Sequence, residues 1–419
     1  MSTSPHPSAA ESVSNRREAI LNLAAVPEVC AAIQWFREQE PRFAQWQAEV
    51  ARIAAPPFGE NARGAWLAEK LASLGLTNVH RDGIGNVLGV DPGVQDDAIS
   101  LSAHLDTVFP ATTPLEIRQQ GRRLCGPGIS DNAAGIVALL AVAAACRQFH
   151  LPHRDSLLFI GNVGEEGEGD LRGMRYIFSN SRLRDWIRAS VVLDGAGSDT
   201  VVAEALGSRR FEIVMRGPGG HSWSDYGAPN PIVAIARAVH FFSETRIPSA
   251  PKTTVNVGVI AGGTSVNSIP ESASIRVDIR STSATEIERV ELELRRAVEQ
   301  AVQAEMARSE QGRLTHSYRE LRAEIHGIGN RPAGALDPNS RIVQLARSVD
   351  TFLSNQAQIQ RASTDANIPI SMGREAIAIG AGGSGGGAHT LQEWFDPTGR
   401  ELGLTRILLI VLALAGGAG

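Results

Sequence analysis

The chain has 419 residues, of which 43% are hydrophobic and 20% are charged, a composition typical of soluble globular proteins. Its length predicts two or three domains. The formal net charge of −5 offers no basic surface of the kind that binds nucleic acid, so we expect no nucleic-acid partner.

The cysteines and the apolar runs bear on the compartment. Cys30, Cys125 and Cys146 are odd in number and lack the spacing of a cysteine zinc site, so they favour a reducing compartment over a disulfide framework. Residues 1–17 contain no apolar run typical of a signal peptide. The apolar run at 407–415 is far shorter than the ~20 residues that cross a bilayer, and it predicts a buried final helix. We therefore expect a cytoplasmic protein without a membrane partner.

The first part of the chain predicts helices followed by a buried sheet. Residues 18–74 carry apolar residues at helical spacing between prolines. Short, continuously apolar runs then follow, and each ends in glycine or polar residues, which is typical of central parallel strands covered on both faces. The Ala-rich segment 132–146 has almost no polar face and predicts a helix packed on that sheet. The apolar runs are 98–105, 155–163, 189–195 and 375–383.

The pattern changes after Glu204 to alternating strands and amphipathic helices. Their order is strand, helix, strand, strand, helix, strand, which predicts a small α+β sandwich with a half-exposed sheet. The segments are 209–217, 230–244, 253–263, 273–281, 285–306 and 319–327. We therefore predict an α/β protein whose mostly parallel domain, residues 1–206 and 329–419, is interrupted by an inserted α+β (β-α-β-β-α-β) domain at 207–328.

Polar residues with metal-binding chemistry begin at the first apolar run. His104 and Asp106 stand two residues apart at its end, so they project from the same face. A metal-bound histidine usually donates its second N–H to a carboxylate, and Asp106 is placed to accept it. Asp131 follows a Gly-rich turn and directly precedes the Ala-rich helix. The alternatives are a polar strand end for the first pair and a helix N-cap for Asp131.

Further candidates follow the other runs. Glu165 and Glu166 lie side by side just beyond the second run. Adjacent carboxylates at such a place repel each other unless a cation or a proton neutralises one of them. One can ligate a metal while its neighbour takes a proton from water, and a solvated acidic loop is the alternative. Asp194 ends the third run, and His389 follows the fourth.

Ligands of open α/β sheets bind outside the carboxyl ends of the strands, where these side chains are expected to meet. Two imidazoles and several carboxylates, without a thiolate, suit zinc, with manganese or cobalt as alternatives. Two divalent ions carry four positive charges, and Asp131, Glu166, Asp194 and one hydroxide carry four negative ones. The sequence therefore predicts a neutral two-metal centre.

The motifs around these residues resemble those of the di-zinc metallopeptidase and amidohydrolase family that contains carboxypeptidase G, aminoacylase, acetylornithine deacetylase, succinyl-diaminopimelate desuccinylase and peptidase T. They match in order from about Pro56 to the C-terminus. The resemblance implies a zinc-exopeptidase catalytic domain with an inserted lid and dimerisation domain. It also implies that His104 and Asp194 hold one metal, that Glu166 and His389 hold the other, that Asp131 bridges both, that Asp106 orients His104, and that Glu165 is the general base.

The resemblance extends into the inserted segment. RGPGGHSWSDYG matches the family's Gly-Gly-His-Ser stretch, which implies that His221 stabilises the oxyanion, often in the partner subunit's active site; a turn histidine is the alternative. SVNSIP places Asn267, and VDIRS places Arg280, where the family holds the substrate's carboxylate or carbonyl. A surface ion pair is the alternative for Arg280. The chain departs from the family at residues 131–135, Asp-Asn-Ala-Ala-Gly, where the family often has a lysine.

These motifs predict a metal-dependent hydrolase that cleaves the amide bond of small peptides. The segment STDANIPISMG resembles the peptidase T branch, which favours an exopeptidase of di- or tripeptides, with a metal-activated water and Glu165 as general base. The alternatives are an N-acyl-amino-acid amidohydrolase or deacetylase, and a catalytically silent binding protein with the same fold. The expected cofactors are two divalent metal ions, zinc before cobalt or manganese. The expected assembly is a homodimer through the inserted domain.

Overall fold

The computed structural model describes residues 9–311 and 320–417. The chain forms two compact units. The large unit contains Met1–Ala205 and Ala335–Gly419, and the inserted unit contains Leu206–Gly334. The expected inserted segment, 207–328, lies within the second unit, and its action as a lid stays a prediction.

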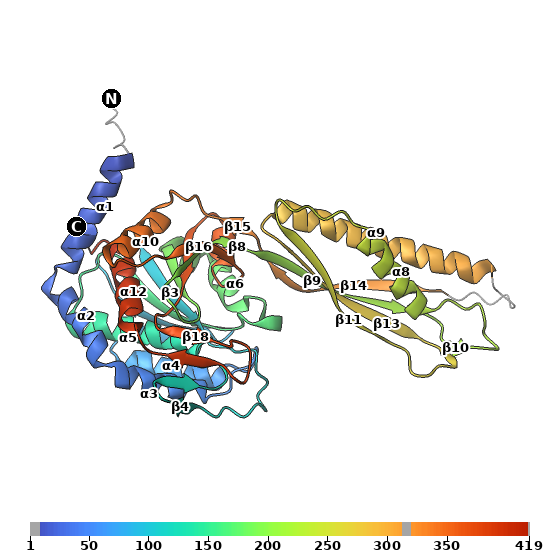
Figure 1. The fold of residues 1–419 in the computed structure, drawn as a ribbon, viewed down its shortest axis with the longest axis horizontal. Coiled ribbons are helices and arrows are strands. Elements are labelled where there is room, and N and C mark those ends of the chain that lie inside the picture. The colour runs from blue at the N-terminus through green and yellow to red at the C-terminus, as the bar shows by residue number, and fades with distance from the viewer. Residues whose placement is uncertain (1–8, 312–319, 418–419) are drawn as a thin grey trace. The chain divides into compact units, whose positions relative to one another are not determined.

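The large unit is built on a nine-stranded sheet (Figure 1). Its strands are β1 Thr77–Arg81, β2 Val87–Asp91, β3 Ala98–His104, β6 Ser156–Asn162, β7 Ile187–Leu193, β8 Thr200–Ala205, β15 Gly334–Ala335, β16 Gln358–Ala362 and β17 Glu375–Ile379. They lie in the order β1-β2-β6-β3-β7-β17-β8-β15, and β16 also pairs with β8. β3 is parallel to β6 and β7, and β17 is parallel to β7, so the predicted parallel core is confirmed. Antiparallel pairs of β1 with β2, β2 with β6 and β17 with β8 make the sheet mixed.

Helices cover both faces of the central strands. Every residue of β3 and β6 is buried, which explains why these runs are continuously apolar instead of alternating. One face packs against α5 (Ala133–Phe149) and α12 (Arg400–Leu414). The other face packs against α6 (Arg172–Ser179) and α11 (Asn367–Ser371). The Ala-rich segment and the apolar run at the end of the chain are therefore buried helices, as predicted.

The remaining helices of the large unit are α1 Ala9–Ala24, α2 Pro27–Glu38, α3 Glu40–Ala51, α4 Asn61–Ser73, α7 Ser181–Trp186 and α10 Arg341–Phe352. Within residues 9–311 and 320–417, no single helix is long and apolar enough to cross a membrane. One bent pair, Asn15–Ala24 with Pro27–Glu38, meets that test when its two helices are taken together.

A second, smaller sheet of the large unit joins the segment before Asp131 to the segment around His389. Its strands are β4 Arg118–Gln120, β5 Arg123–Cys125, β18 Ser384–Gly386 and β19 Trp394–Asp396. They lie in the order β18-β19-β5-β4. Strands of three residues are too short to show a periodicity, so the sequence patterns did not predict this sheet.

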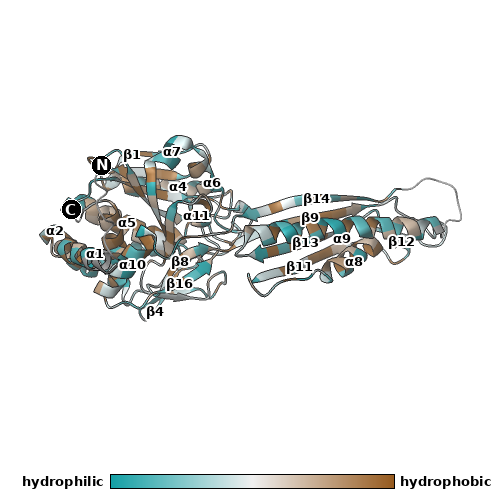
Figure 2. Ribbon diagram, turned by 90° about the horizontal axis from the view of Figure 1, so that it is seen from above, coloured by the Kyte–Doolittle hydropathy of each residue, from teal (hydrophilic) through white to brown (hydrophobic). Residues whose placement is uncertain are grey.

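The inserted unit is a four-stranded antiparallel sheet with two helices packed on one face. Its elements are β9 Gly207–Arg216, α8 Pro231–Ser243, β11 Thr253–Gly262, β13 Ser272–Ser281, α9 Ala284–Gln311 and β14 Arg322–Arg331. The sheet order is β11-β13-β9-β14, and apolar residues of the sheet and both helices share one core. The predicted β-α-β-β-α-β order is confirmed, with the short strands β10 (Gly220–His221) and β12 (Ser268–Ile269) added. Helix α8 is mainly hydrophobic, whereas α9 also carries many hydrophilic residues (Figure 2).

Candidate metal centre

Three neighbouring strands deliver candidate side chains to one edge of the large sheet. His104 is the last residue of β3, and Asp194 directly follows β7. Glu165 and Glu166 follow β6, and both are buried. Because β6 and β7 both run parallel to β3, their carboxyl ends meet beside His104.

Asp131 reaches the same edge from the loop before α5. The first turn of α5 is capped by Asn132, whose side chain accepts the N–H of Gly135 at 3.2 Å. The N-cap alternative for Asp131 is therefore wrong. The Asp131 carboxylate instead faces the imidazoles of the site.

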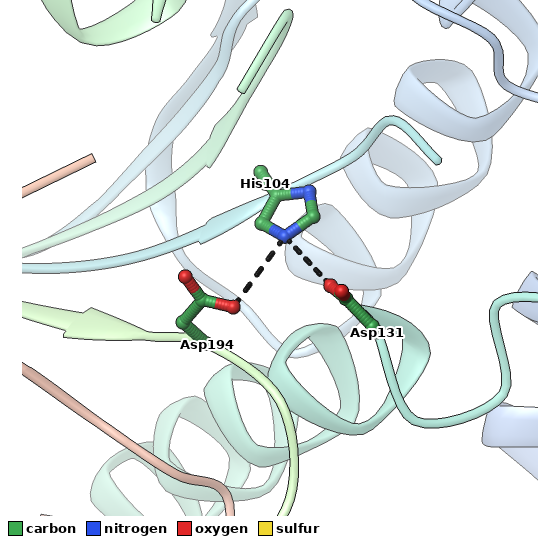
Figure 3. A group of neighbouring side chains, drawn as sticks. All are labelled: His104, Asp131 and Asp194. Carbon is green, nitrogen blue, oxygen red and sulfur yellow. Dashed lines mark hydrogen bonds and ion pairs between the residues drawn. The ribbon is translucent and has the colours of Figure 1, made fainter. Parts of the chain in front are cut away.

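His104 lies between two carboxylates (Figure 3). Its Nε2 is 3.1 Å from Oδ1 of Asp131 and 3.8 Å from Oδ1 of Asp194. Its Nδ1 is 3.1 Å from the backbone oxygen of Asp106. A carbonyl oxygen can only accept, so Nδ1 carries a proton, and the lone pair of a neutral His104 ring lies on Nε2, toward the two carboxylates.

His389 meets the other oxygen of Asp131. Its Nε2 is 3.1 Å from Oδ2 of Asp131 and 3.0 Å from Oε1 of Glu166. The two oxygens of one carboxylate thus face two different imidazoles. This arrangement places Asp131 between two groups of potential ligands, one with His104 and Asp194, the other with His389 and Glu166.

The charges of this edge attract cations. Burial disfavours a charge on His104, but Asp106, Asp131 and Asp194 outweigh burial and raise the pKa of His104 well above its usual value. The contact with Asp131 raises the pKa of His389 to about 9. Burial tends to raise the pKa of Asp131, yet the two imidazoles outweigh burial and lower it. Carboxylates that retain their charge while they draw protons onto neighbouring imidazoles also favour metal cations.

Asp106 orients the acidic loop after β6. Its Oδ1 accepts the backbone N–H of Glu165 at 2.9 Å, and its Oδ2 accepts that of Glu166 at 2.7 Å. Oδ1 also lies 3.7 Å from Nδ1 of His104, farther than the backbone oxygen of Asp106 itself. The carboxylate of Asp106 therefore contacts the backbone of the candidate base and of one candidate ligand more closely than it contacts the imidazole.

The donor set fits two divalent ions. Within each of three groups, the potential ligand atoms lie within 4.8 Å of one another. Nitrogen and carboxylate donors without a thiolate suit zinc, manganese or cobalt. The three groups are His104 with Asp131 and Asp194, Asp131 with Glu166 and His389, and His104 with Glu165 and Glu166.

The other candidates lie in the inserted unit. His221 belongs to β10, which pairs with β12, so the segment that carries Asn267 lies beside it. The N–H of Ser222 donates to the backbone oxygen of Asn267 at 2.9 Å. Arg280 stands on β13, and its Nε donates to Oδ2 of Asp278 at 2.7 Å. The structure thus brings His221 and Asn267 together and gives Arg280 an ion pair within the inserted unit.

Three buried residues of the large unit escaped the sequence reasoning. Glu393 accepts backbone N–H groups of the loop that carries Asp131, and Arg63 donates to the backbone beside His104. Asp365 is fully buried, and burial raises its pKa to about 7. Its Oδ2 accepts an N–H from Nδ2 of Asn162 at 2.6 Å. Asp365 belongs to the segment STDANIPISMG, but nothing in the sequence shows that its side chain is buried.

Comparison with known proteins places this arrangement in a family. The model of peptidase family M20/M25/M40 matches residues 100–412, which is more than half of the chain. A probable carboxypeptidase of Aspergillus flavus is 30% identical over 235 residues, covering 50% of this chain and 52% of its own length. The chain spans about half the length of the curated relatives it matches.

Solved structures share the fold. A tripeptidase of Staphylococcus aureus is 21% identical, with a TM-score of 0.72, over 90% of this chain and 99% of its own. The YXEP protein of Bacillus subtilis, described as a dinuclear metal-binding peptidase, is 15% identical, with a TM-score of 0.63, over 91% of this chain and 99% of its own. The family model and the shared fold agree with the resemblance seen in the motifs. The chain therefore belongs to peptidase family M20/M25/M40, a family of hydrolytic enzymes.

Proposed function

We propose that the chain is an exopeptidase that cleaves the amide bond of di- or tripeptides with two divalent metal ions. Zinc is the proposed metal, ahead of cobalt and manganese. The observation that carries this proposal is the position of Asp131, whose two carboxylate oxygens face the imidazoles of His104 and His389. When bound, the two ions act as Lewis acids on the scissile carbonyl and make water nucleophilic near neutral pH.

The candidate ligands divide into two sets around Asp131. His104 and Asp194 would hold one ion, and Glu166 and His389 would hold the other. Asp131 would be shared. Its flanking contacts at 3.1 Å on both sides support this role, because a shared ligand must offer one oxygen to each set.

Glu165 is the proposed general base. Its side chain is buried, and its carboxylate lies in one ligand group with His104 and Glu166. Asp106 fixes its backbone through the N–H at 2.9 Å. A buried, fixed carboxylate next to the ligands can take a proton from water and pass it to the leaving amine, a role that typically contributes 10²–10⁴-fold.

His221 is the proposed oxyanion donor. Its Nδ1 accepts the backbone N–H of Trp223 at 3.2 Å, so the proton of a neutral His221 ring lies on Nε2. Its own backbone N–H donates to Oδ2 of Asp225 at 2.8 Å. The loop thus supports the tautomer that can donate from Nε2 to a developing negative oxygen. Such a donor is typically worth about 2.7–4 kcal/mol.

Peptides are the proposed substrates because the structurally similar protein from Staphylococcus aureus is a tripeptidase and the relative from Aspergillus flavus is a probable carboxypeptidase. Asn267, beside His221, and Arg280 would hold the substrate's carboxylate or carbonyl. An N-acyl-amino-acid amidohydrolase uses the same catalytic groups. Activity on N-acetyl amino acids with no activity on di- and tripeptides would favour that alternative.

A homodimer through the inserted unit is part of the proposal. Strand β11 is an edge of the inserted sheet, and its Val259 and Ile260 are exposed. Exposed apolar edge strands pair readily with a second copy. Light scattering of the purified chain should give twice the mass of one chain, and a monomer at micromolar concentration would contradict the dimer.

The central experiment compares two glutamates of one loop. Glu165→Gln should retain both metals, measured by elemental analysis, and lose nearly all peptidase activity. Glu168→Gln changes an exposed carboxylate three residues further on and should keep both the metals and the peptidase activity. Wild-type turnover in the fully metallated Glu165→Gln protein would exclude Glu165 as the base. A wild-type chain that binds no transition metal and gains no activity from one would favour a catalytically silent binding protein.

A further inference from the structure

Glu393 is a fully buried carboxylate that faces backbone N–H groups. Its Oε1 accepts the N–H groups of Ser130 and Asp131, both at 2.7 Å, and its Oε2 accepts the N–H of Gly128 at 2.9 Å. Its backbone oxygen accepts a fourth N–H, from Gly126, at 2.8 Å. Glu393 therefore accepts four backbone N–H groups from residues 126–131, the loop that carries Asp131.

The same residue belongs to the segment that carries His389. Glu393 lies four residues beyond His389 and directly before β19, which pairs with β5 ahead of the Asp131 loop. The side chains of Asp131 and His389 lie 3.1 Å apart. Glu393 is thus the link between two chain segments, far apart in sequence, that each supply one candidate ligand.

Arg63 of α4 is a buried cation that contacts the backbone beside His104. Its Nη1 donates to the backbone oxygen of Leu105 at 2.9 Å, between His104 and Asp106, and its Nε donates to that of Ile53 at 3.1 Å. Burial lowers the pKa of Arg63 to about 10, and the nearby carboxylates of Asp106 and Glu393 oppose this fall, so the guanidinium keeps its charge at neutral pH. Its positive charge attracts the carboxylates of Asp106 and Glu393.

We propose that Glu393 is a positioning residue of the metal centre: it fixes the Asp131 loop against the His389 segment before any metal binds, and it thereby sets the metal affinity. This inference rests on the proposed metal-dependent function. Glu393 contacts backbone, so it is neither a ligand nor a catalytic residue. Partners that orient metal ligands typically contribute 10–100-fold to metal affinity or activity.

Glu393→Gln tests this role with almost no change in volume. The glutamine oxygen can still accept the N–H groups of Ser130 and Asp131, but its NH₂ group then faces the N–H of Gly128. Two donors cannot pair, so the loop must shift. The matched control is Asp350→Asn, which changes another buried carboxylate of the large unit, one that accepts Arg406 Nε at 2.6 Å in the packing of α10 against α12.

The full-length proteins are freed of metal and titrated with ZnCl₂ against a chelator of known affinity. Glu393→Gln should bind Zn²⁺ 10- to 100-fold more weakly than wild type, and Asp350→Asn should bind it with wild-type affinity although it is less stable. The visible absorption of Co²⁺-loaded protein should shift in Glu393→Gln and remain unchanged in Asp350→Asn, because a general loss of stability does not alter ligand geometry.

Wild-type Zn²⁺ affinity and an unchanged Co²⁺ spectrum in Glu393→Gln would overturn the inference and leave the proposed function standing. A wild-type chain that binds no Zn²⁺ would overturn both. If Glu393→Gln does not fold, amide exchange of the metal-free wild type decides. Slow exchange of Gly128, Ser130 and Asp131 supports a loop fixed before metal binding, and exchange at unfolded-chain rates refutes it.

Discussion

Asp106→Asn isolates the contribution of one carboxylate to the position of the acidic loop. Asp106 is fully buried, and each of its oxygens accepts one backbone N–H, from Glu165 at 2.9 Å and from Glu166 at 2.7 Å. Asparagine has nearly the same shape but only one oxygen. Its NH₂ group must therefore face one of these two N–H groups, which is left buried without an acceptor.

The magnitude follows from that single unpaired donor. A buried N–H that loses its acceptor costs about 1–3 kcal/mol. Since every 1.4 kcal/mol is a factor of ten, the loop should open about 5- to 150-fold more often. The lost attraction between Asp106 and the buried guanidinium of Arg63 acts in the same direction.

Hydrogen–deuterium exchange of the metal-free protein measures this change where it occurs. The amides of Glu165 and Glu166 should exchange faster in Asp106→Asn by that factor, while the amides of α12 keep their wild-type rates. Asp91→Asn is the control, because Asp91 is also buried but accepts an N–H from Nη1 of Arg147 at 2.8 Å and does not contact this loop. Wild-type exchange at both glutamates in Asp106→Asn would refute the claim that its carboxylate positions them.

Further predictions concern pH, a buried ion pair and metal removal. Burial raises the pKa of Glu40 from 4.5 to about 7, so the folded chain keeps a proton that the unfolded chain releases. The free energy of unfolding should therefore fall by at most about 3 kcal/mol as pH rises from 4.5 to 7. Glu40→Gln should remove this pH dependence from denaturation midpoints measured at pH 5 and 8. Asp350→Ala leaves the buried Arg406 without its carboxylate partner and should cost roughly 3–5 kcal/mol in denaturant titrations; a loss below 1 kcal/mol would contradict this. A chelator should lower the Tm, and ZnCl₂ at about 100 times its Kd should restore about 2.7 kcal/mol of the free energy of unfolding. A Tm that changes with neither the chelator nor ZnCl₂ would argue against a metal site.

The elements that the sequence predicted are those that show one pattern over many residues. The runs at 98–105 and 155–163 are continuously apolar because helices cover both faces of β3 and β6. The parallel order of these strands then explains why His104 and Asp194 meet. Segments with three-residue strands, such as β4 and β5, carry no periodicity, and the pairing of β5 with β19 joins residues hundreds of positions apart along the chain.

The candidate site was predictable in its residue types but not in its geometry. The sequence left Asp131 open to an N-cap role, and only the fold shows that Asn132 caps α5. The spacing of His104 and Asp106 predicts that they meet, and the fold adds that the imidazole Nδ1 lies nearer the backbone oxygen of Asp106 than its carboxylate, which also accepts the N–H groups of Glu165 and Glu166. Which N–H group a side-chain oxygen accepts depends on the distances between donors and acceptors in the folded chain.

Two kinds of buried acid meet at this edge of the sheet, and their partners distinguish them. A carboxylate removed from water must be compensated by hydrogen bonds or by opposite charge. Glu393 accepts three backbone N–H groups and Asp106 accepts two, so backbone donors of the protein face both acids. The carboxylates of Asp131 and Glu166 are contacted instead by imidazoles, which compensate them only when protonated. Neutral imidazoles leave that charge for a cation, and we therefore propose Asp131 and Glu166 as metal ligands and place Asp106 and Glu393 in the frame that holds them.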